Sequence, residues 1–190
     1  MPKLIYIHGF NSSEQSEKAE KIKQRCEQMG CADVFISPRL PWEPNQAIHL
    51  LSELIEKHLL EGVTLCGSSL GGFYATYLSQ KYTIKSVLVN PAVGAYNLLE
   101  QHLGEQFNPY TQESYVLKQE HMQQLLDLEV TDIDDALFWL MLQEGDETLD
   151  YKKALQKYPT VKTLLESNGS HRFEGFERFI DDVLSFAEII

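Results

Sequence analysis

Residues 63–72 read VTLCGSSLGG and carry the pattern that decides the fold. An apolar run ends in Gly-x-Ser-x-Gly, with Ser69 at its centre, and apolar residues at helical spacing follow. A serine hydroxyl is a weak nucleophile, and it must project from a tight turn toward a base. Gly67 and Gly71 leave room for the strand and the helix to pass closely. The stretch therefore predicts a strand, a sharp turn that presents Ser69, and a helix. The alternative is a strand-to-helix turn of small residues without chemistry.

A nucleophilic serine in such a turn uses a histidine base that follows it along the chain. Among six histidines His171 fits best, because it comes after the apolar run 161–165 and the turn 168–170 and before a helical pattern. We therefore expect it on a loop past the carboxyl end of a strand, where ligands gather in open α/β sheets. His8 precedes Ser69, which is the wrong order for the base. The other four lie in a helical pattern or in a polar region: His49, His58, His102 and His121.

Asp146 is the preferred acid. It follows residues 137–142, the most apolar run of the chain, so we expect it just past another strand end. The acid accepts the Nδ1 proton of the imidazole and stabilises the imidazolium. The alternatives are Glu144 as the acid, or Asp146 as only a turn or helix-capping residue.

A third requirement is a pair of backbone N–H groups for the charge that develops on the substrate oxygen. One comes from the residue after the nucleophile, here Leu70, and the other from the loop after an early strand. Residues 4–7 have the pattern of that strand, and HGFNS at 8–12 follows. This indicates the N–H of Phe10 as the second donor. The alternative is a plain turn capped by a polar residue of the same loop.

Five segments together resemble the YqiA-like bacterial esterases, a small branch of the α/β-hydrolase superfamily. They are LIYIHGFNSS (4–13), GSSLGGFYA (67–75), NPA (90–92), GDETLDY (145–151) and GSHRFEGFE (169–177). The resemblance runs nearly end to end and implies hydrolysis of carboxylic esters, including esters and thioesters of acyl chains. It also implies Ser69 as nucleophile, Asp146 as acid and His171 as base, with N–H groups from Phe10 and Leu70. Such chemistry needs no metal and no organic cofactor.

Strand and helix patterns alternate along the chain. This rhythm predicts a single α/β domain over residues 1–190, with a mostly parallel sheet covered by helices on both faces. The resemblance implies six strands in the order 2-1-3-4-5-6. The expected strands are 3–7, 34–37, 63–66, 86–89, 137–143 and 161–166. The expected helices are 14–29, 46–60, 70–82, 149–158 and 175–189.

Residues 96–135 break this rhythm, because the segment is long, polar and rich in Gln, Glu, Leu and Tyr. Long insertions of this kind are usually functional or disordered, and in α/β-hydrolases this connection often carries a lid. We therefore expect a short lid-like insertion. Trp42, in the proline-rich segment 38–44, lines a pocket or packs in the core. The same two interpretations apply to the apolar residues of the insertion: Leu98, Leu99, Leu103, Phe107, Tyr110, Tyr115, Met122, Leu125 and Leu126.

The composition is that of a soluble globular protein, with 43% hydrophobic residues. No apolar run reaches the ~18–20 residues needed to span a membrane, and the first residues show no signal-peptide pattern. Cys26, Cys31 and Cys66 have no metal-site spacing. Without an export signal they are expected to be reduced thiols of a cytoplasmic protein.

The formal net charge of −12 argues against nucleic-acid binding, which depends on neutralising phosphates with Lys and Arg. It also disfavours stable binding to anionic membranes. An anionic substrate remains compatible with a local basic patch, for which the candidates are Lys81, Lys85, Lys152, Lys153 and Arg172. The expected partner is a small-molecule ester or thioester, and the sequence leaves the oligomeric state open.

The sequence thus predicts a serine hydrolase that cleaves carboxylic esters through an acyl-enzyme intermediate. One alternative is an acyl-CoA thioesterase, which would use the same triad. The other is a non-catalytic ligand-binding protein with a hydrolase fold, although such a protein has no need for all three triad residues.

Overall fold

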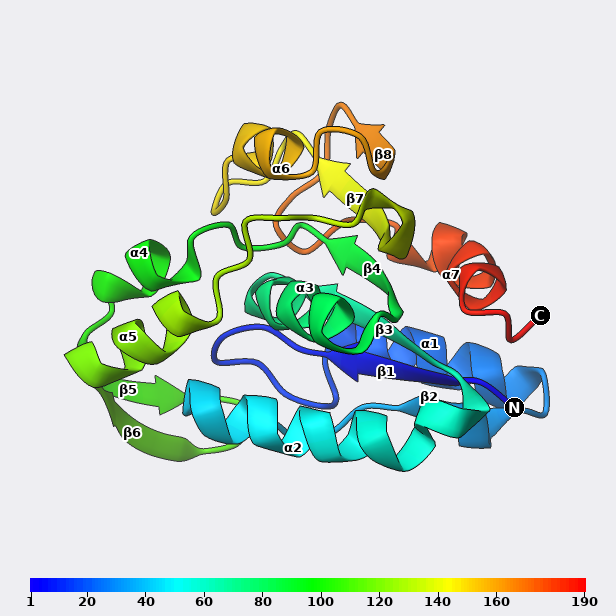
Figure 1. Cartoon of the computed structure of the whole chain (residues 1–190), viewed down its shortest axis with the longest axis horizontal. Helices are drawn as coiled ribbons and strands as arrows, with labels where there is room; N and C mark the ends of the chain where they lie inside the picture. The colour runs from blue at the N-terminus through cyan, green and yellow to red at the C-terminus, as the bar shows by residue number, and fades with distance from the viewer.

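A six-stranded parallel sheet runs through the centre of the computed structural model, which describes residues 1–190 (Figure 1). Its strand order is β2-β1-β3-β4-β7-β8, and every neighbouring pair is parallel. This confirms the predicted order 2-1-3-4-5-6, because β5 and β6 belong to a separate hairpin. The strands of the sheet are β1 (Lys3–Ile7), β2 (Phe35–Ile36), β3 (Val63–Ser68), β4 (Lys85–Val89), β7 (Phe138–Gln143) and β8 (Lys162–Glu166).

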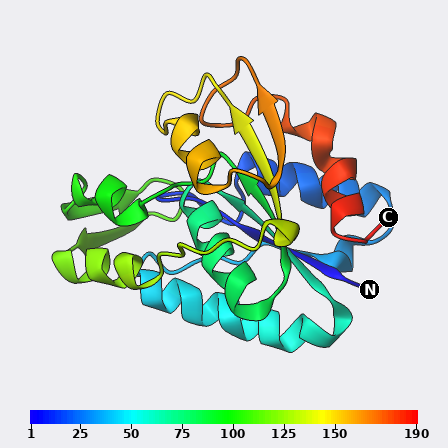
Figure 2. The ribbon, with the colours of Figure 1, turned by 45° about the horizontal axis from the view of Figure 1, so that its top comes forward.

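Helices cover both faces of this sheet, and alternate side chains of β1 enter two different cores. One core lies between the sheet and the helices α2 (Pro44–His58) and α3 (Leu70–Tyr82). The other lies beneath α1 (Glu17–Gln28) and α7 (Ile180–Phe186). Figure 2 shows these two pairs of helices on opposite sides of the sheet. Strands that are buried on both faces are apolar almost throughout, which explains why the central strands lack polar alternation.

The predicted helix boundaries shift by a few residues at turns. α1 begins at Glu17 and not at residue 14, because the Ser16 N–H bonds the Ser13 carbonyl in a preceding turn. The helix expected over 149–158 is α6 (Tyr151–Lys157), and the Asp150 side chain caps its first turn. The helix expected over 175–189 is divided into a 3-10 turn and α7. The 3-10 turns are η1 (Ala32–Val34), η2 (Leu59–Glu61), η3 (Asp135–Leu137) and η4 (Phe176–Phe179).

The insertion between β4 and β7 is ordered and lies beyond the carboxyl ends of the central strands (Figure 1). It contains α4 (Ala95–Glu100), the antiparallel hairpin of β5 (Gly104–Asn108) and β6 (Glu113–Leu117), and α5 (Gln119–Asp127). The sequence does not predict this hairpin, because β5 reads GEQFN and has only one large apolar residue to mark an alternation. No helix of the protein is both long enough and apolar enough to cross a membrane.

Gly71 marks the closest approach of α3 to the sheet. An ideal Cβ at this position would lie 1.9 Å from the Ile7 carbonyl oxygen, so alanine must push the helix away from β1. Overpacking of this kind costs up to ~3 kcal/mol or more. We expect Gly71→Ala to lower the melting temperature by about 6–12 °C, since each kcal/mol shifts it by about 2–4 °C in a chain of this size. Thermal denaturation followed by circular dichroism measures the change.

Gly30→Ala is the matched control. Gly30 has a φ of 72° but no heavy atom within 4 Å of an added Cβ. Only the left-handed backbone opposes this substitution, at about 1 kcal/mol. Equal losses of melting temperature in the two variants would contradict the steric explanation.

Candidate active site

Ser69 lies in the turn between β3 and α3. Its φ of 56° and ψ of −121° are conformations that few non-glycine residues adopt. Neighbouring strands and loops hold this backbone in place: the Ser69 N–H donates to the Val89 carbonyl at 3.2 Å, and the Ser69 carbonyl accepts the Ala92 N–H at 3.0 Å. The turn is possible because Gly67 has no Cβ, which would lie 2.3 Å from the Gly71 carbonyl oxygen.

His171 and Asp146 meet Ser69 although they are distant in the sequence. His171 Nε2 lies 3.1 Å from Ser69 Oγ, and His171 Nδ1 lies 2.8 and 3.0 Å from the two carboxylate oxygens of Asp146. The Asp146 side chain is 2% exposed and that of His171 is 23% exposed. Water therefore reaches the histidine but hardly reaches the carboxylate. The arrangement suits transfer of a proton from the serine hydroxyl to a histidine that is oriented by an acid.

Asp146 also caps its own turn. Its Oδ1 accepts the N–H groups of Thr148 and Leu149 at 2.9 and 2.8 Å. The two interpretations of Asp146 are therefore compatible, because the carboxylate both stabilises the turn and faces His171. The rival acid, Glu144, has an exposed side chain that does not bond His171.

Three residues for which the sequence predicted no role in the site fix the loop that carries His171. Asn90 Nδ2 donates to the carbonyls of Ser170 and His171 at 3.1 and 3.3 Å. Gln143 Oε1 accepts the Ser170 N–H at 3.1 Å, and Glu147 Oε2 accepts the His171 N–H at 2.9 Å. This last bond holds the pKa of Glu147 below its ordinary value. Only their positions in the sequence could have indicated two of these residues. Asn90 directly follows the apolar strand β4, and Gln143 is the last residue of the apolar strand β7.

The loop after β1 lies against Ser69. An ideal Cβ on Gly9 would come within 3.2 Å of Ser69 Cβ, so the loop backbone passes directly over the serine. The N–H of Phe10 has no hydrogen-bond acceptor within the protein. Leu70 is the first residue of α3, and an N–H at that position has no partner within its own helix. Neither predicted donor N–H is therefore used by a hydrogen bond of its own loop or helix.

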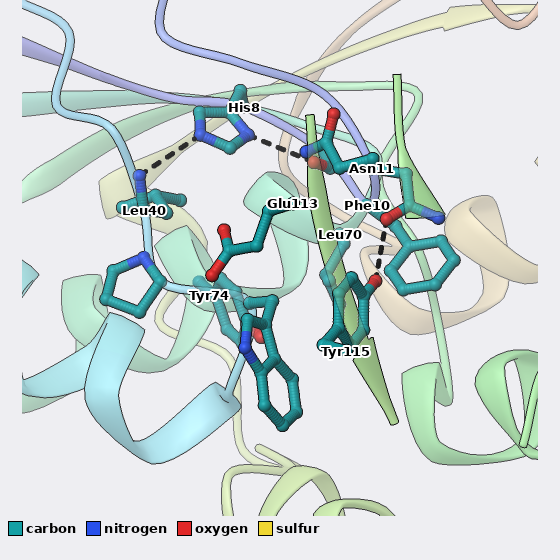
Figure 3. Close-up of a pocket in the computed structure, with 12 residues that line it drawn as sticks. His8, Phe10, Asn11, Leu40, Leu70, Tyr74, Glu113 and Tyr115 are labelled. Carbon is teal, nitrogen blue, oxygen red and sulfur yellow. Dashed lines mark hydrogen bonds between the residues drawn. The ribbon is translucent and has the colours of Figure 1, made fainter. Parts of the chain in front are cut away.

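His8 ties this loop to the segment that precedes α2. It is 6% exposed, its Nδ1 donates to the Gly9 carbonyl at 3.0 Å, and its Nε2 accepts the Leu40 N–H at 3.3 Å (Figure 3). The two bonds together require a neutral ring with its proton on Nδ1. Burial lowers the pKa of His8 below its ordinary value, which favours that neutral form. His8 thus has a structural place near the site and is not positioned as the base.

Two cavities open on Ser69. The first has a volume of about 120 Å³ and is mainly apolar, with Leu98 and Leu99 of the insertion in its wall. The second has a volume of about 310 Å³, is more polar, and includes His171. The apolar residues of the insertion therefore have both predicted roles. Leu98 and Leu99 line a pocket, whereas Met122 packs in the core under α2 and α3.

A third, smaller cavity of about 30 Å³ lies under the hairpin (Figure 3). Trp42 stacks on Tyr115 in its wall, with ring centroids 4.5 Å apart and planes inclined by 14°. Trp42 therefore both packs and lines a cavity, although this cavity does not include Ser69.

The hairpin is hydrogen-bonded to the loop after β1. The Tyr115 hydroxyl donates to Asn11 Oδ1 at 2.6 Å (Figure 3), and Asn11 Nδ2 donates to Gln106 Oε1 at 3.4 Å. Asn108 Nδ2 donates to the Ser12 carbonyl at 2.8 Å. These contacts join the insertion to the residues that directly follow Phe10.

Among the basic candidates only Arg172 lines a cavity that opens on Ser69. Lys85 pairs with Glu188 at 2.5 Å, and Lys81 bonds the Ser52 hydroxyl at 3.4 Å. Lys18, which the sequence did not indicate, lines the same cavity as Arg172. The three cysteines are buried free thiols, and no three His, Cys, Asp or Glu side chains are grouped as a metal site requires.

Comparison with known protein sequences gives two matches that span nearly the whole chain. A family model described as "Uncharacterised protein family (UPF0227)" matches residues 3–188. The UPF0227 protein YcfP of Salmonella paratyphi A (strain ATCC 9150 / SARB42) is 23% identical over 187 residues, which covers 96% of this chain and 97% of YcfP.

Two solved structures share the fold at low sequence identity. Alpha/beta hydrolase domain-containing protein 10 from mouse matches with a TM-score of 0.73 and 19% identity, over 96% of this chain and 89% of the mouse chain. Est1E from Butyrivibrio proteoclasticus, with ferulic acid bound, matches with a TM-score of 0.68 and 13% identity, over 99% of this chain and 87% of Est1E. These similarities show the α/β-hydrolase fold.

His8 should make the protein less stable in acid. Because burial lowers its pKa in the folded state, the unfolded chain binds the extra proton first, from its own pKa near 6.5 downward. The free energy of unfolding therefore falls below about pH 6.5, by at most about 1.4 kcal/mol per pH unit from this residue. His8→Asn cannot titrate here and keeps a donor for the Gly9 carbonyl. Urea denaturation between pH 7.5 and 5.5 should give this variant the shallower dependence on pH, and equal slopes would contradict the assignment.

Proposed function

Because the chain belongs to the uncharacterised protein family UPF0227 and has the α/β-hydrolase fold, we propose that it is a serine hydrolase of carboxylic esters. The observation that carries this proposal is the chain of contacts from Asp146 through His171 to Ser69, at 2.8 and 3.1 Å. A protein that only bound a ligand would need neither the strained serine nor the histidine aimed at its hydroxyl.

The proposed reaction uses the same groups in both half-reactions. His171 takes the proton of Ser69 as Oγ attacks the ester carbonyl, and Asp146 stabilises the imidazolium. The N–H groups of Phe10 and Leu70 hold the oxyanion. His171 then protonates the leaving alcohol, and water cleaves the acyl-enzyme by the same route.

The apolar cavity suits the acyl group of the substrate. Its volume of about 120 Å³ is similar to that of a ~150 Å³ cavity that admits benzene, so a short acyl chain of roughly four carbons fits. The same triad chemistry serves a thioester. Turnover of an oxygen ester and of a thioester with the same acyl group therefore tells these two substrate classes apart.

Ser69→Ala removes the nucleophile, and we expect it to lower the rate at least ~10⁴-fold, as triad substitutions do elsewhere. Intact-mass spectrometry after exposure to a fluorophosphonate should show one adduct on the wild-type protein and none on this variant. Ser68→Ala is the matched control, because it removes the neighbouring hydroxyl of the same motif and should leave the labelling. A folded wild-type protein that takes up no adduct would refute the proposal.

Leu98→Ala should enlarge the apolar cavity and shift the preference toward longer acyl chains. Each additional buried methylene contributes about 0.8 kcal/mol, or roughly a fourfold gain in kcat/KM. The measurement compares butyryl with hexanoyl nitrophenyl esters. Leu126→Ala makes the same change of size outside the cavity and should keep the wild-type profile. An unchanged profile in Leu98→Ala would show that the acyl chain binds elsewhere.

A further inference from the structure

The two cavities at Ser69 differ in their access to His171. The apolar cavity includes Ser69 but not His171, whereas the polar cavity includes both. A general acid must reach the atom that it protonates. If the proposed function holds, the leaving group therefore lies in the polar cavity and the acyl group lies in the apolar one.

The charged side chains that line the polar cavity are positive, which is unusual for this acidic protein. Lys18 and Arg172 line it, and no carboxylate does. The whole chain contains 28 acidic and 16 basic residues. A cavity lined by two cations and no carboxylate is therefore the opposite of what the overall charge of the protein would predict. Glu17, which adjoins Lys18 in the sequence, pairs instead with Lys21 at 2.8 Å.

The Lys18 ammonium has spare hydrogen-bonding capacity. Its Nζ donates to the Arg172 carbonyl at 2.7 Å, whereas an ammonium has three donors. Burial lowers the pKa of Lys18 to about 8; Cys66 and Glu17 partly oppose this shift, and the nearby Arg172 guanidinium adds to it. A partly buried cation that no carboxylate contacts directly is costly, so an anion bound in this cavity would stabilise it.

We propose that the leaving group of the substrate carries a carboxylate or a phosphate within a few bonds of the ester oxygen, and that Lys18 and Arg172 bind this anion. Cationic side chains form strong, charge-assisted hydrogen bonds with both groups. Arg172 directly follows His171, so the anion lies near the leaving oxygen and not at the far end of a long carrier. Hydrolysis adds one water across the acyl C–O bond and releases a carboxylic acid and an anionic alcohol.

The test compares two butyryl esters of nearly equal size. Carboxymethyl butyrate has a carboxylate on its leaving group, and carbamoylmethyl butyrate has the neutral amide in its place. We expect the wild-type protein to favour the carboxylate ester by about tenfold or more in kcat/KM, the scale of a hydrogen bond to a charged group. The corresponding 2-phosphoethyl butyrate, assayed in parallel, tells a phosphate site from a carboxylate site.

Lys18→Gln and Arg172→Gln should each reduce this ratio about tenfold. Lys18→Arg should preserve it, because the charge is kept. Lys153→Gln removes an exposed lysine from α6 and should leave the ratio as in the wild type. If Lys18 only holds the His171 loop through the Arg172 carbonyl, both esters will lose turnover equally, and the unchanged ratio will overturn the proposal.

The outcomes separate this inference from the proposed function. Labelling of Ser69 with equal turnover of the two esters would overturn the anion site and leave the hydrolase. Turnover of neither ester by a labelled protein would also overturn the anion site. A folded protein that is not labelled at Ser69 would overturn the hydrolase, and the anion site with it.

Discussion

The close contact between β3 and α3 is the constraint on which the rest of the site depends. Gly67 and Gly71 bring strand and helix so near that the connecting residue must take a φ of 56°. Such a conformation persists only where the surroundings determine it, and here bonds to Val89 and Ala92 supply that support. The same contact sets where the first N–H of α3 lies, so one feature positions both the Ser69 hydroxyl and the proposed donor of Leu70.

Local signals made much of this structure predictable, and long-range contacts made the rest unpredictable. The central strands and their helices follow from hydrophobic periodicity, and residues that follow apolar runs indicated Asp146 and His171. The hairpin was not predicted because the inward positions of β5 are Gly104, Gln106 and Asn108, so this strand shows no apolar alternation. The place of Lys18 in the polar cavity was not predicted, because its contact with Arg172 spans 154 positions. Nothing in the helical pattern distinguishes it from the other lysines of α1.

The surroundings of Ser69 are asymmetric in polarity and in charge. Apolar side chains gather on one side and two cations on the other, within a protein whose net charge is −12. Charges on the outer surface are largely screened beyond about 8 Å at physiological ionic strength. The field inside a cavity is therefore governed by the groups that line it and not by the total charge. An acidic protein can in this way contain a locally positive site.

The hydrogen bonds between the hairpin and the loop after β1 link access to catalysis mechanically. If the hairpin lifts to admit a molecule, Tyr115 and Asn108 must either release Asn11 and Ser12 or draw them along. These two residues directly follow Phe10, the proposed second N–H donor, and Gly9 before it lies against Ser69. A movement of the hairpin would therefore be transmitted to the backbone next to this proposed donor. With the hairpin bonded to this loop, the loop stays against the serine while the His171 side chain remains 23% exposed to water.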